Sequence, residues 1–209
     1  MSSITPQLVL ASGSPRRQSL LRDAGYQFQV IVPRPEAECG VCTSTGPSDL
    51  VRQLALRKAA DVVEQISGSG DHAARVLLAA DTVAECRGQV LGKPLDAEHA
   101  RKMLEQMQGR EHRVYTGICV WSLSKREDLQ PPHVEAVVTN LIMDPLTDGQ
   151  IDVYLDSDAW CGKAGGFGYQ DGLDWVHVVE GSESNVVGLP MERVAELLAK
   201  FQVFTRPLP

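Results

Sequence analysis

The stretch LVLASGSPRRQSLL, residues 8–21, carries the signals of a strand, a tight turn and a helix in immediate succession. Its apolar start predicts a strand, and Ser14 followed by Pro15 predicts the N-cap and first residue of a helix. Arg16 and Arg17 then fall in the first helical turn. The free N–H groups and the helix dipole already make this end positive, so each cation costs about 0.3–1 kcal/mol there. A bound anion would offset that cost, and the stretch therefore predicts an anion site.

The composition limits the classes of protein to which this chain can belong. Its 209 residues are 43% hydrophobic, which is enough to bury the core of a single domain spanning residues 1–209. The formal net charge is −7 and the pI is near 5.2, whereas general binders of nucleic acid need a basic face. We therefore expect no nucleic-acid partner, and any polyanion must bind in a local basic pocket.

Apolar runs and cysteines indicate the compartment. No basic N-terminal segment precedes a long apolar stretch, and no run of about 18 apolar residues occurs, so we expect no membrane association and a cytoplasmic location. The five cysteines lack the spacing of a disulfide framework, which fits a reducing compartment. Cys39 and Cys42 form a C-x-x-C, but zinc would need two further ligands, such as Cys86 or Cys161, so ordinary thiols are the simpler interpretation.

Strand-like and amphipathic helix-like segments alternate along the chain, which is typical of an α/β layered domain. Arg87 and Gly88 suit a two-residue hairpin turn, Thr147 and Gln150 suit a capping box, and residues 181–190 are expected to form a loop. The expected strands cover residues 8–11, 28–32, 75–80, 83–86, 89–91, 113–123, 133–143 and 175–179. The expected helices begin near residues 15, 48, 96 and 147, and a last helix ends near residue 201.

Lys58 occupies an unusual place on the second expected helix. The apolar stripe of this helix runs through Val51, Ala55 and Val62, and at about 100° per residue Lys58 falls in the middle of the stripe. Two interpretations are open. In one, the lysine stem covers apolar surface while the ammonium reaches water. In the other, the helix presents the cation into a cleft.

Asp81 follows the apolar run RVLLAA, residues 75–80, and is expected at the carboxyl end of a buried strand. In open α/β sheets, ligands bind at that edge, where carboxylates hold metals or act as bases. An ordinary turn residue would also end a strand with aspartate, so both interpretations are open. Lys93, in LGKP, is likewise either a ligand-binding cation or part of a surface turn.

The stretch GKAGGFGYQDG, residues 162–172, is rich in glycine, and such a backbone lets N–H groups approach a ligand closely. It lacks the spacing of a dinucleotide fingerprint, and the loop after the first strand lacks the Walker A pattern. A mobile linker is the alternative, but a linker would not need Lys163, Phe167, Tyr169 and Gln170. Scattered cations, one carboxylate and a glycine loop together suit a phosphate-rich, metal-bound small molecule.

The motifs LVLASGSPRRQSLL, LALRKA, AADTV, LGKP, GKAGGFGYQ and NVVGLP occur in this order along the chain. In their order and approximate spacing, the chain resembles the Maf family of nucleoside triphosphate pyrophosphatases over residues 7–200. The resemblance implies an α/β domain with a mixed central sheet flanked by helices and two lobes around a deep cleft. It also implies hydrolysis of a nucleoside triphosphate to monophosphate and pyrophosphate, with Mg²⁺ or Mn²⁺ as cofactor.

The resemblance also implies roles for individual residues. Asp81 resembles the proton acceptor that activates water for attack on the α-phosphorus, and the metal ligands would be Asp81 with Glu36 and Glu38. The glutamates are separated by one residue in RPEAEC, where the family usually shows an acidic pair, so either could approach the metal. The expected substrate-binding residues are Ser12, Ser14, Arg16, Arg17, Lys58, Thr82, Lys93, Lys163 and Gln170.

Three of these positions separate branches of the family. Arg16, Thr82 and Gln170 resemble the branch that acts on dTTP and UTP, whereas the branch acting on 7-methyl-GTP tends to carry Trp, Gln and Glu there. A pyrimidine triphosphate or a modified analogue is therefore the expected substrate. Two departures from the family concern base recognition: Gly162, where many members have Asp, and Asp171, where members have Gly.

The resemblance leaves more than one function open. A nucleotide-binding regulator of cell division with little or no catalysis is the alternative to the enzyme, but such a protein could dispense with Asp81. A nucleotidyl- or phosphotransferase would need an acceptor site that the sequence does not reveal. A homodimer is expected from the resemblance alone.

Overall fold

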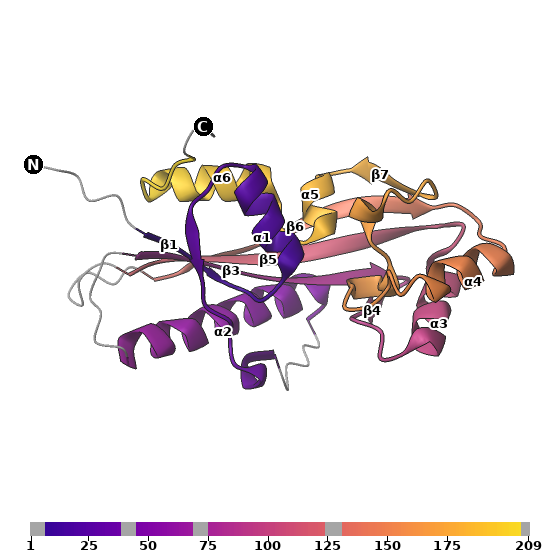
Figure 1. Ribbon diagram of the computed structural model, residues 1–209, viewed down its shortest axis with the longest axis horizontal. Helices are drawn as coiled ribbons and strands as arrows, with labels where there is room; N and C mark the ends of the chain where they lie inside the picture. The colour runs from indigo at the N-terminus through magenta and orange to yellow at the C-terminus, as the bar shows by residue number, and fades with distance from the viewer. Residues whose placement is uncertain (1–6, 39–44, 69–74, 124–130, 206–209) are drawn as a thin grey trace, which may run out of the picture.

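The computed structural model describes residues 7–38, 45–68, 75–123 and 131–205, which form a mixed seven-stranded sheet with helices on both faces (Figure 1). The strand order is β2-β1-β3-β5-β6-β7, and β4 also pairs with β3. β1 is parallel to β2 and β3, and the other pairs are antiparallel. The expected α/β class with a mixed central sheet is confirmed. The strands are β1 (Gln7–Ala11), β2 (Phe28–Val30), β3 (Arg75–Cys86), β4 (Gln89–Leu91), β5 (Arg110–Leu123), β6 (His133–Met143) and β7 (Val176–Glu180).

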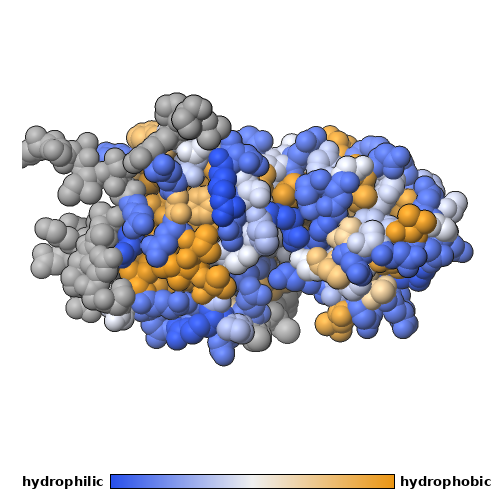
Figure 2. All heavy atoms as spheres, viewed as in Figure 1, coloured by the Kyte–Doolittle hydropathy of each residue, from blue (hydrophilic) through white to orange (hydrophobic). Residues whose placement is uncertain are grey.

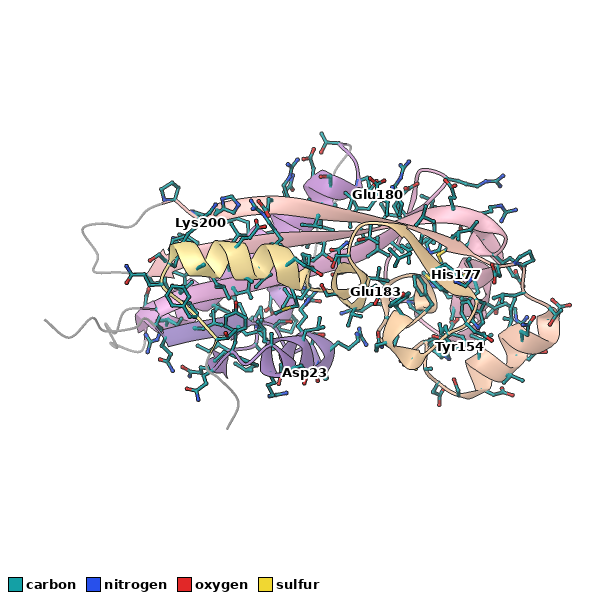
Figure 3. The ribbon with its side chains drawn as sticks, turned by 90° about the horizontal axis from the view of Figure 1, so that it is seen from above. Asp23, Tyr154, His177, Glu180, Glu183 and Lys200 are labelled. Carbon is teal, nitrogen blue, oxygen red and sulfur yellow. The ribbon has the colours of Figure 1, made fainter. Side chains whose placement is uncertain are left out.

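Helices cover both faces of the sheet at one end, and a second group of helices lies at the other end (Figure 1). α2 lies on one face, α1 and α6 lie on the opposite face, and α3 and α4 pack at the far end. Seen from above, Glu183 at the start of α5 lies between α6 and the end that carries Tyr154 of α4 (Figure 3). The helices are α1 (Pro15–Asp23), α2 (Pro47–Gly68), α3 (Ala97–Met107), α4 (Asp148–Asp156), α5 (Glu183–Val187) and α6 (Met191–Lys200), with 3-10 helices η1 (Pro35–Glu38), η2 (Ala164–Gly166) and η3 (Tyr169–Asp171).

β1 is buried on both faces because it lies inside the sheet between two helical layers. Leu8 and Leu10 pack into the core cluster shared with α1 and α6, whereas Val9 and Ala11 pack into the cluster shared with α2. This double burial explains why the opening stretch of the sequence is continuously apolar instead of alternating.

β3 runs without a break from Arg75 to Cys86, so the expectation that a strand ends at Asp81 is wrong. The antiparallel partner β5 pairs with β3 well past Asp81, because a polar side chain does not interrupt backbone hydrogen bonding. On the other side of β3, β1 pairs with residues 75–79 and β4 with residues 84–86. Residues 80–83 therefore form an open edge between these two neighbours.

One predicted turn and one predicted helix cap are confirmed. Arg87 and Gly88 both have positive φ, 56° and 80°, as a type I′ hairpin turn requires. Thr147 and Gln150 form the expected capping box at the start of α4.

Other local predictions are wrong in part. β2 ends at Val30, two residues early, and β5 begins three residues early at Arg110. Ser14 occupies the N-cap position of α1, but its side chain makes no capping hydrogen bond. The expected loop at residues 181–190 contains α5, whose five residues are too few to show helical periodicity in the sequence.

Among the described residues, no helix is both long and apolar enough to span a bilayer. Cys86 and Cys161 are free thiols, and Cys86 is buried. Cys39 and Cys42, the C-x-x-C pair, lie outside the described residues.

Candidate active site

A cavity of about 490 Å³ opens where the edge of β3 lacks a neighbour. It lies between the end of the molecule with α1 and α2 and the end that carries the glycine-rich segment, so it separates two lobes as expected. In Figure 2, hydrophilic residues cross the middle of this face between orange patches on either side. All the predicted site residues line the cavity except Ser12 and Glu36; those that do are Ser14, Arg16, Arg17, Glu38, Lys58, Asp81, Thr82, Lys93, Lys163 and Gln170.

Lys58 is 4% exposed and points into the cavity wall, so the interpretation in which its ammonium reaches water is wrong. Its Nζ lies 2.6 Å from Asp81 Oδ1 and 2.9 Å from Glu38 Oε1. A buried ammonium needs such partners, because desolvation of an unpaired cation is strongly unfavourable. Partial burial works against the charge of Glu38, but the hydrogen bond and charge of Lys58, helped by Lys93 and Arg17, hold the pKa of Glu38 below its usual value.

Gly117 of β5 allows α2 to bring Lys58 to Asp81. Gly117 lies opposite Asp81 in the sheet, and a Cβ added there would overlap the backbone carbonyl of Val51 in α2. A larger residue would therefore push the helix away from the sheet. The close approach of helix and strand places the ammonium beside the carboxylate.

Arg17 is buried in the wall on the other face of β3 and holds three segments together. Its Nε donates to the Gly188 carbonyl at 2.7 Å, Nη1 donates to Ser12 Oγ at 3.2 Å, and Nη2 donates to Thr82 Oγ1 at 3.0 Å. Burial lowers the pKa of Arg17, while the negative charge of Asp81 opposes that shift. Ser12 thus lies behind the wall and supports Arg17 without lining the cavity.

Arg16 spans the cavity between the two lobes. Its Nη2 donates to the carbonyl oxygen of Gly162 at 2.9 Å, which connects the first turn of α1 to the glycine-rich segment. Burial lowers the pKa of Arg16, and the charge of Asp171 acts in the opposite direction. The two arginines of the opening stretch therefore differ: Arg17 braces one lobe, and Arg16 joins the two.

On the opposite wall, Lys163 forms an ion pair with Asp171, and Gln170 donates from Nε2 to Asp171 Oδ1 at 3.0 Å.

Lys93 is different from the other cations of the cavity, because its side chain is 62% exposed and its Nζ lies 4.0 Å from Glu38 Oε2. It can therefore move toward a ligand more easily than the buried cations.

The charge of the cavity wall is opposite to that of the whole chain. Among the described residues, five cationic side chains and two carboxylates line it, although the chain carries a net charge of −7. A cavity with an excess of one sign of charge concentrates ligands of the opposite sign. The wall is therefore suited to a polyanion of small-molecule size.

The donor set fits a metal that binds together with its ligand. No group of three or more His, Cys, Asp or Glu within the described ranges could hold a cation alone. Glu38 and Asp81 nevertheless converge on one ammonium. Mg²⁺ is typically held by one or two carboxylates plus substrate phosphates and water, so these two residues fit it. Glu36 lies outside the cavity, where its carbonyl accepts a hydrogen bond from Arg57 at 3.0 Å.

The short helix α5 and the glycine after it supply part of the cavity wall. These residues were not predicted from the sequence as part of the site. Val186, Val187 and Gly188 line the cavity, and Val114 and Phe167 add apolar surface. The motif NVVGLP contained a signal for this segment, but its apolar residues carry no chemistry from which a contact could be inferred. The sequence singled out Asp171 only because members of the family have Gly at this position.

Comparisons with known proteins agree with these observations. A family model described as Maf-like protein matches residues 7–201. The dTTP/UTP pyrophosphatase of Rhodopirellula baltica is 52% identical over 196 residues, which cover 93% of this chain and 82% of that protein. The dTTP/UTP pyrophosphatase of Bacillus cereus is 37% identical over 198 residues, covering 94% of this chain and 96% of the relative.

Among solved structures, the superposition with the Ham1 protein of Staphylococcus aureus covers 66% of this chain and 71% of the Ham1 chain, with 14% sequence identity and a TM-score of 0.39. The family assignment rests on the sequence matches instead, which extend over nearly the whole chain. By these matches the chain belongs to the Maf family.

Proposed function

We propose that this chain hydrolyses dTTP and UTP, or modified pyrimidine analogues, to the nucleoside monophosphate and pyrophosphate. The names of the two relatives suggest the substrates. The observation that carries the proposal is the place of Asp81, a carboxylate on the wall of a cavity with five surrounding cations. A cytoplasmic location is part of the proposal, because nucleoside triphosphates are abundant there.

In this reaction Asp81 takes the proton of the attacking water. Lys58 holds Oδ1 and so fixes the carboxylate, and the second oxygen can accept the proton. The water oxygen forms a bond to the α-phosphorus while the bond from that phosphorus to its bridging oxygen breaks. Pyrophosphate leaves with the bonding electron pair.

The cations of the wall stabilise the charge that spreads over the phosphates. Lys93 is exposed enough to follow the leaving pyrophosphate, whereas Arg17 keeps Ser12 and Thr82 in place. A bound Mg²⁺ or Mn²⁺, held by Glu38 and Asp81, would neutralise further phosphate charge.

The test is pyrophosphate release from dTTP and UTP in the presence of Mg²⁺ or Mn²⁺. Asp81→Asn should lower kcat by about 10²–10⁴-fold while triphosphate binding stays measurable. Asp96→Asn is the matched control, since Asp96 caps α3 through a bond to the His99 N–H and Asn is an equally good cap.

Hydrolysis in water enriched in heavy oxygen identifies the bond that breaks. The proposal expects the label in the monophosphate. Label in pyrophosphate, or orthophosphate as the sole product, would place the attack elsewhere and overturn the proposal. Tight nucleotide binding without turnover would favour the regulator instead.

A further inference from the structure

Asp171 contacts two residues of the cavity wall without lining the cavity itself. Its Oδ2 pairs with the ammonium of Lys163, and its Oδ1 accepts the hydrogen bond from Gln170 Nε2 at 3.0 Å. The side chains of Lys163 and Asp171 are only 11% and 25% exposed, so this pair is shielded from solvent more than an ordinary surface pair. Asp171 thus ties the start of the glycine-rich segment, at Lys163, to η3 near its end, which carries Gln170.

Tyr169, which precedes Gln170, is also held by a hydrogen bond. The Tyr169 hydroxyl donates to Glu183 Oε1 at 2.9 Å and so links η3 to α5, near the middle of the molecule (Figure 3). Gly168 has ordinary extended backbone, but a Cβ there would overlap both Asp171 Oδ2 and Lys163 Nζ. The ion pair therefore fills the space beside this glycine. With both neighbours fixed, Gln170 is preorganised for binding.

The contact with Asp171 determines which end of the Gln170 amide is available to a ligand. An ionised carboxylate can only accept hydrogen bonds, so the amide nitrogen must face Asp171. The carbonyl oxygen Oε1 is then the other end of the amide, and within the described part of the chain it has no hydrogen-bond donor. Since Gln170 lines the cavity, the wall offers an acceptor at this point.

We propose that Asp171 is a positioning residue that sets the base selectivity of the cavity, by holding Gln170 with its carbonyl oxygen toward the ligand. Uracil and thymine carry an N–H at ring position 3, whereas cytosine carries an unprotonated acceptor nitrogen there. An acceptor on the wall pairs with the first two and repels the third. This inference rests on the proposed function, because it concerns the base of the same nucleotide.

The test compares kcat/KM for UTP and CTP in the unaltered chain and in Asp171→Asn. Asparagine keeps the shape but can donate as well as accept, so Gln170 can turn its amide nitrogen toward the cavity. The ratio of the two kcat/KM values should fall about tenfold, with CTP improving relative to UTP. Gly168→Ala displaces the ion pair without removing a charge and should lower the ratio in the same direction.

Two controls separate positioning from a general structural role. Asp152→Asn removes a comparable carboxylate that pairs with Arg101 away from the cavity, and it should leave the ratio unchanged. In a double-mutant cycle, Asp171→Asn added to Gln170→Ala should not change the ratio further, because Asp171 acts through the amide.

An unchanged ratio in Asp171→Asn, or a wild type that treats UTP and CTP alike, overturns the inference while pyrophosphate release still supports the proposed function. Absence of pyrophosphate release from every nucleotide instead contradicts the proposed function. In that case the dissociation constants of UTP and CTP, measured by calorimetry on the same variants, decide the inference by the same ratio.

Discussion

Lys58 Nζ and Asp81 Oδ1 lie 2.6 Å apart, where α2 meets the stretch of β3 that has no strand partner on one side. The lysine comes from the apolar face of α2 and the aspartate from the middle of a long strand. Each charged group stabilises the other, because neither charge would be tolerated at so buried a place without an oppositely charged partner. The pair is also directed at the cavity, so a contact that stabilises the fold simultaneously orients the general base of the proposed reaction.

Lys58→Met should damage activity more than stability. Methionine fills the same space but leaves Asp81 and Glu38 facing each other without a cation, so kcat/KM for dTTP should fall by about 10²-fold or more. The free energy of unfolding should fall by about 1–3 kcal/mol, less than for a fully buried pair because Glu38 is half exposed. Urea denaturation and pyrophosphate release measure the two effects.

Lys102→Met is the control for this change. Lys102 pairs with Glu98 at 2.7 Å on the exposed surface of α3, so its loss should leave both the free energy of unfolding and turnover nearly unchanged. A Lys58→Met protein with normal kinetics and a large loss of stability would reduce Lys58 to a packing residue.

Gly117→Ala should separate α2 from β5. The added methyl group overlaps the Val51 carbonyl, so the helix must move and Lys58 must move away from Asp81. Overpacking of this kind lowers the free energy of unfolding by about 1–3 kcal/mol, and activity should fall with it. Gly149→Ala, where no atom lies within 4 Å of the added Cβ, should instead leave activity unchanged and preserve or slightly raise the melting temperature. Equal behaviour of the two variants would show that α2 is not positioned through this contact.

Periodicity identified Lys58 as anomalous, but its partners could not be predicted, because they come from segments that only the fold brings together. Asp81 lies on the cavity wall, where the sequence placed a ligand-binding carboxylate, although the strand boundary was wrong. A carboxylate marks a change in burial, not an end of backbone pairing. The role of Asp171 depends on a contact across a turn, with Lys163 eight residues away, which no residue pattern reveals. The alternation of strand-like and helix-like segments was sufficient to predict the α/β class, since this alternation follows from local preferences.

Arg17→Lys should not behave as a conservative change. A lysine cannot reproduce the geometry in which one guanidinium bonds Ser12, Thr82 and the Gly188 carbonyl at once. The unpaired groups should lower the free energy of unfolding by about 1–3 kcal/mol, and the displaced wall should lower kcat/KM on the order of 10²-fold. Arg22→Lys, in the same helix but exposed, should retain near-normal stability and turnover. Similar losses in both variants would contradict a specific role for Arg17.

His112 should make the stability of the protein depend on pH. Its imidazole is 2% exposed and meets the ring of Phe167, a cavity residue, edge to face at 5.4 Å. Burial lowers the pKa of His112 from 6.5 to about 4, against weaker opposing effects of the Arg110 carbonyl and Glu85. Between these two values the unfolded chain binds a proton that the folded chain does not.

Lowering the pH through that window should therefore favour unfolding, by up to about 1.4 kcal/mol per pH unit from this residue. The stability that neutral His112 contributes is fully present above pH 6.5 and is lost progressively as the pH falls toward 4. His112→Phe keeps an aromatic ring against Phe167 but cannot take up a proton, so its free energy of unfolding should fall less steeply between these values. Urea denaturation of both proteins across the window measures the difference, and parallel curves would show that His112 is not the titrating group.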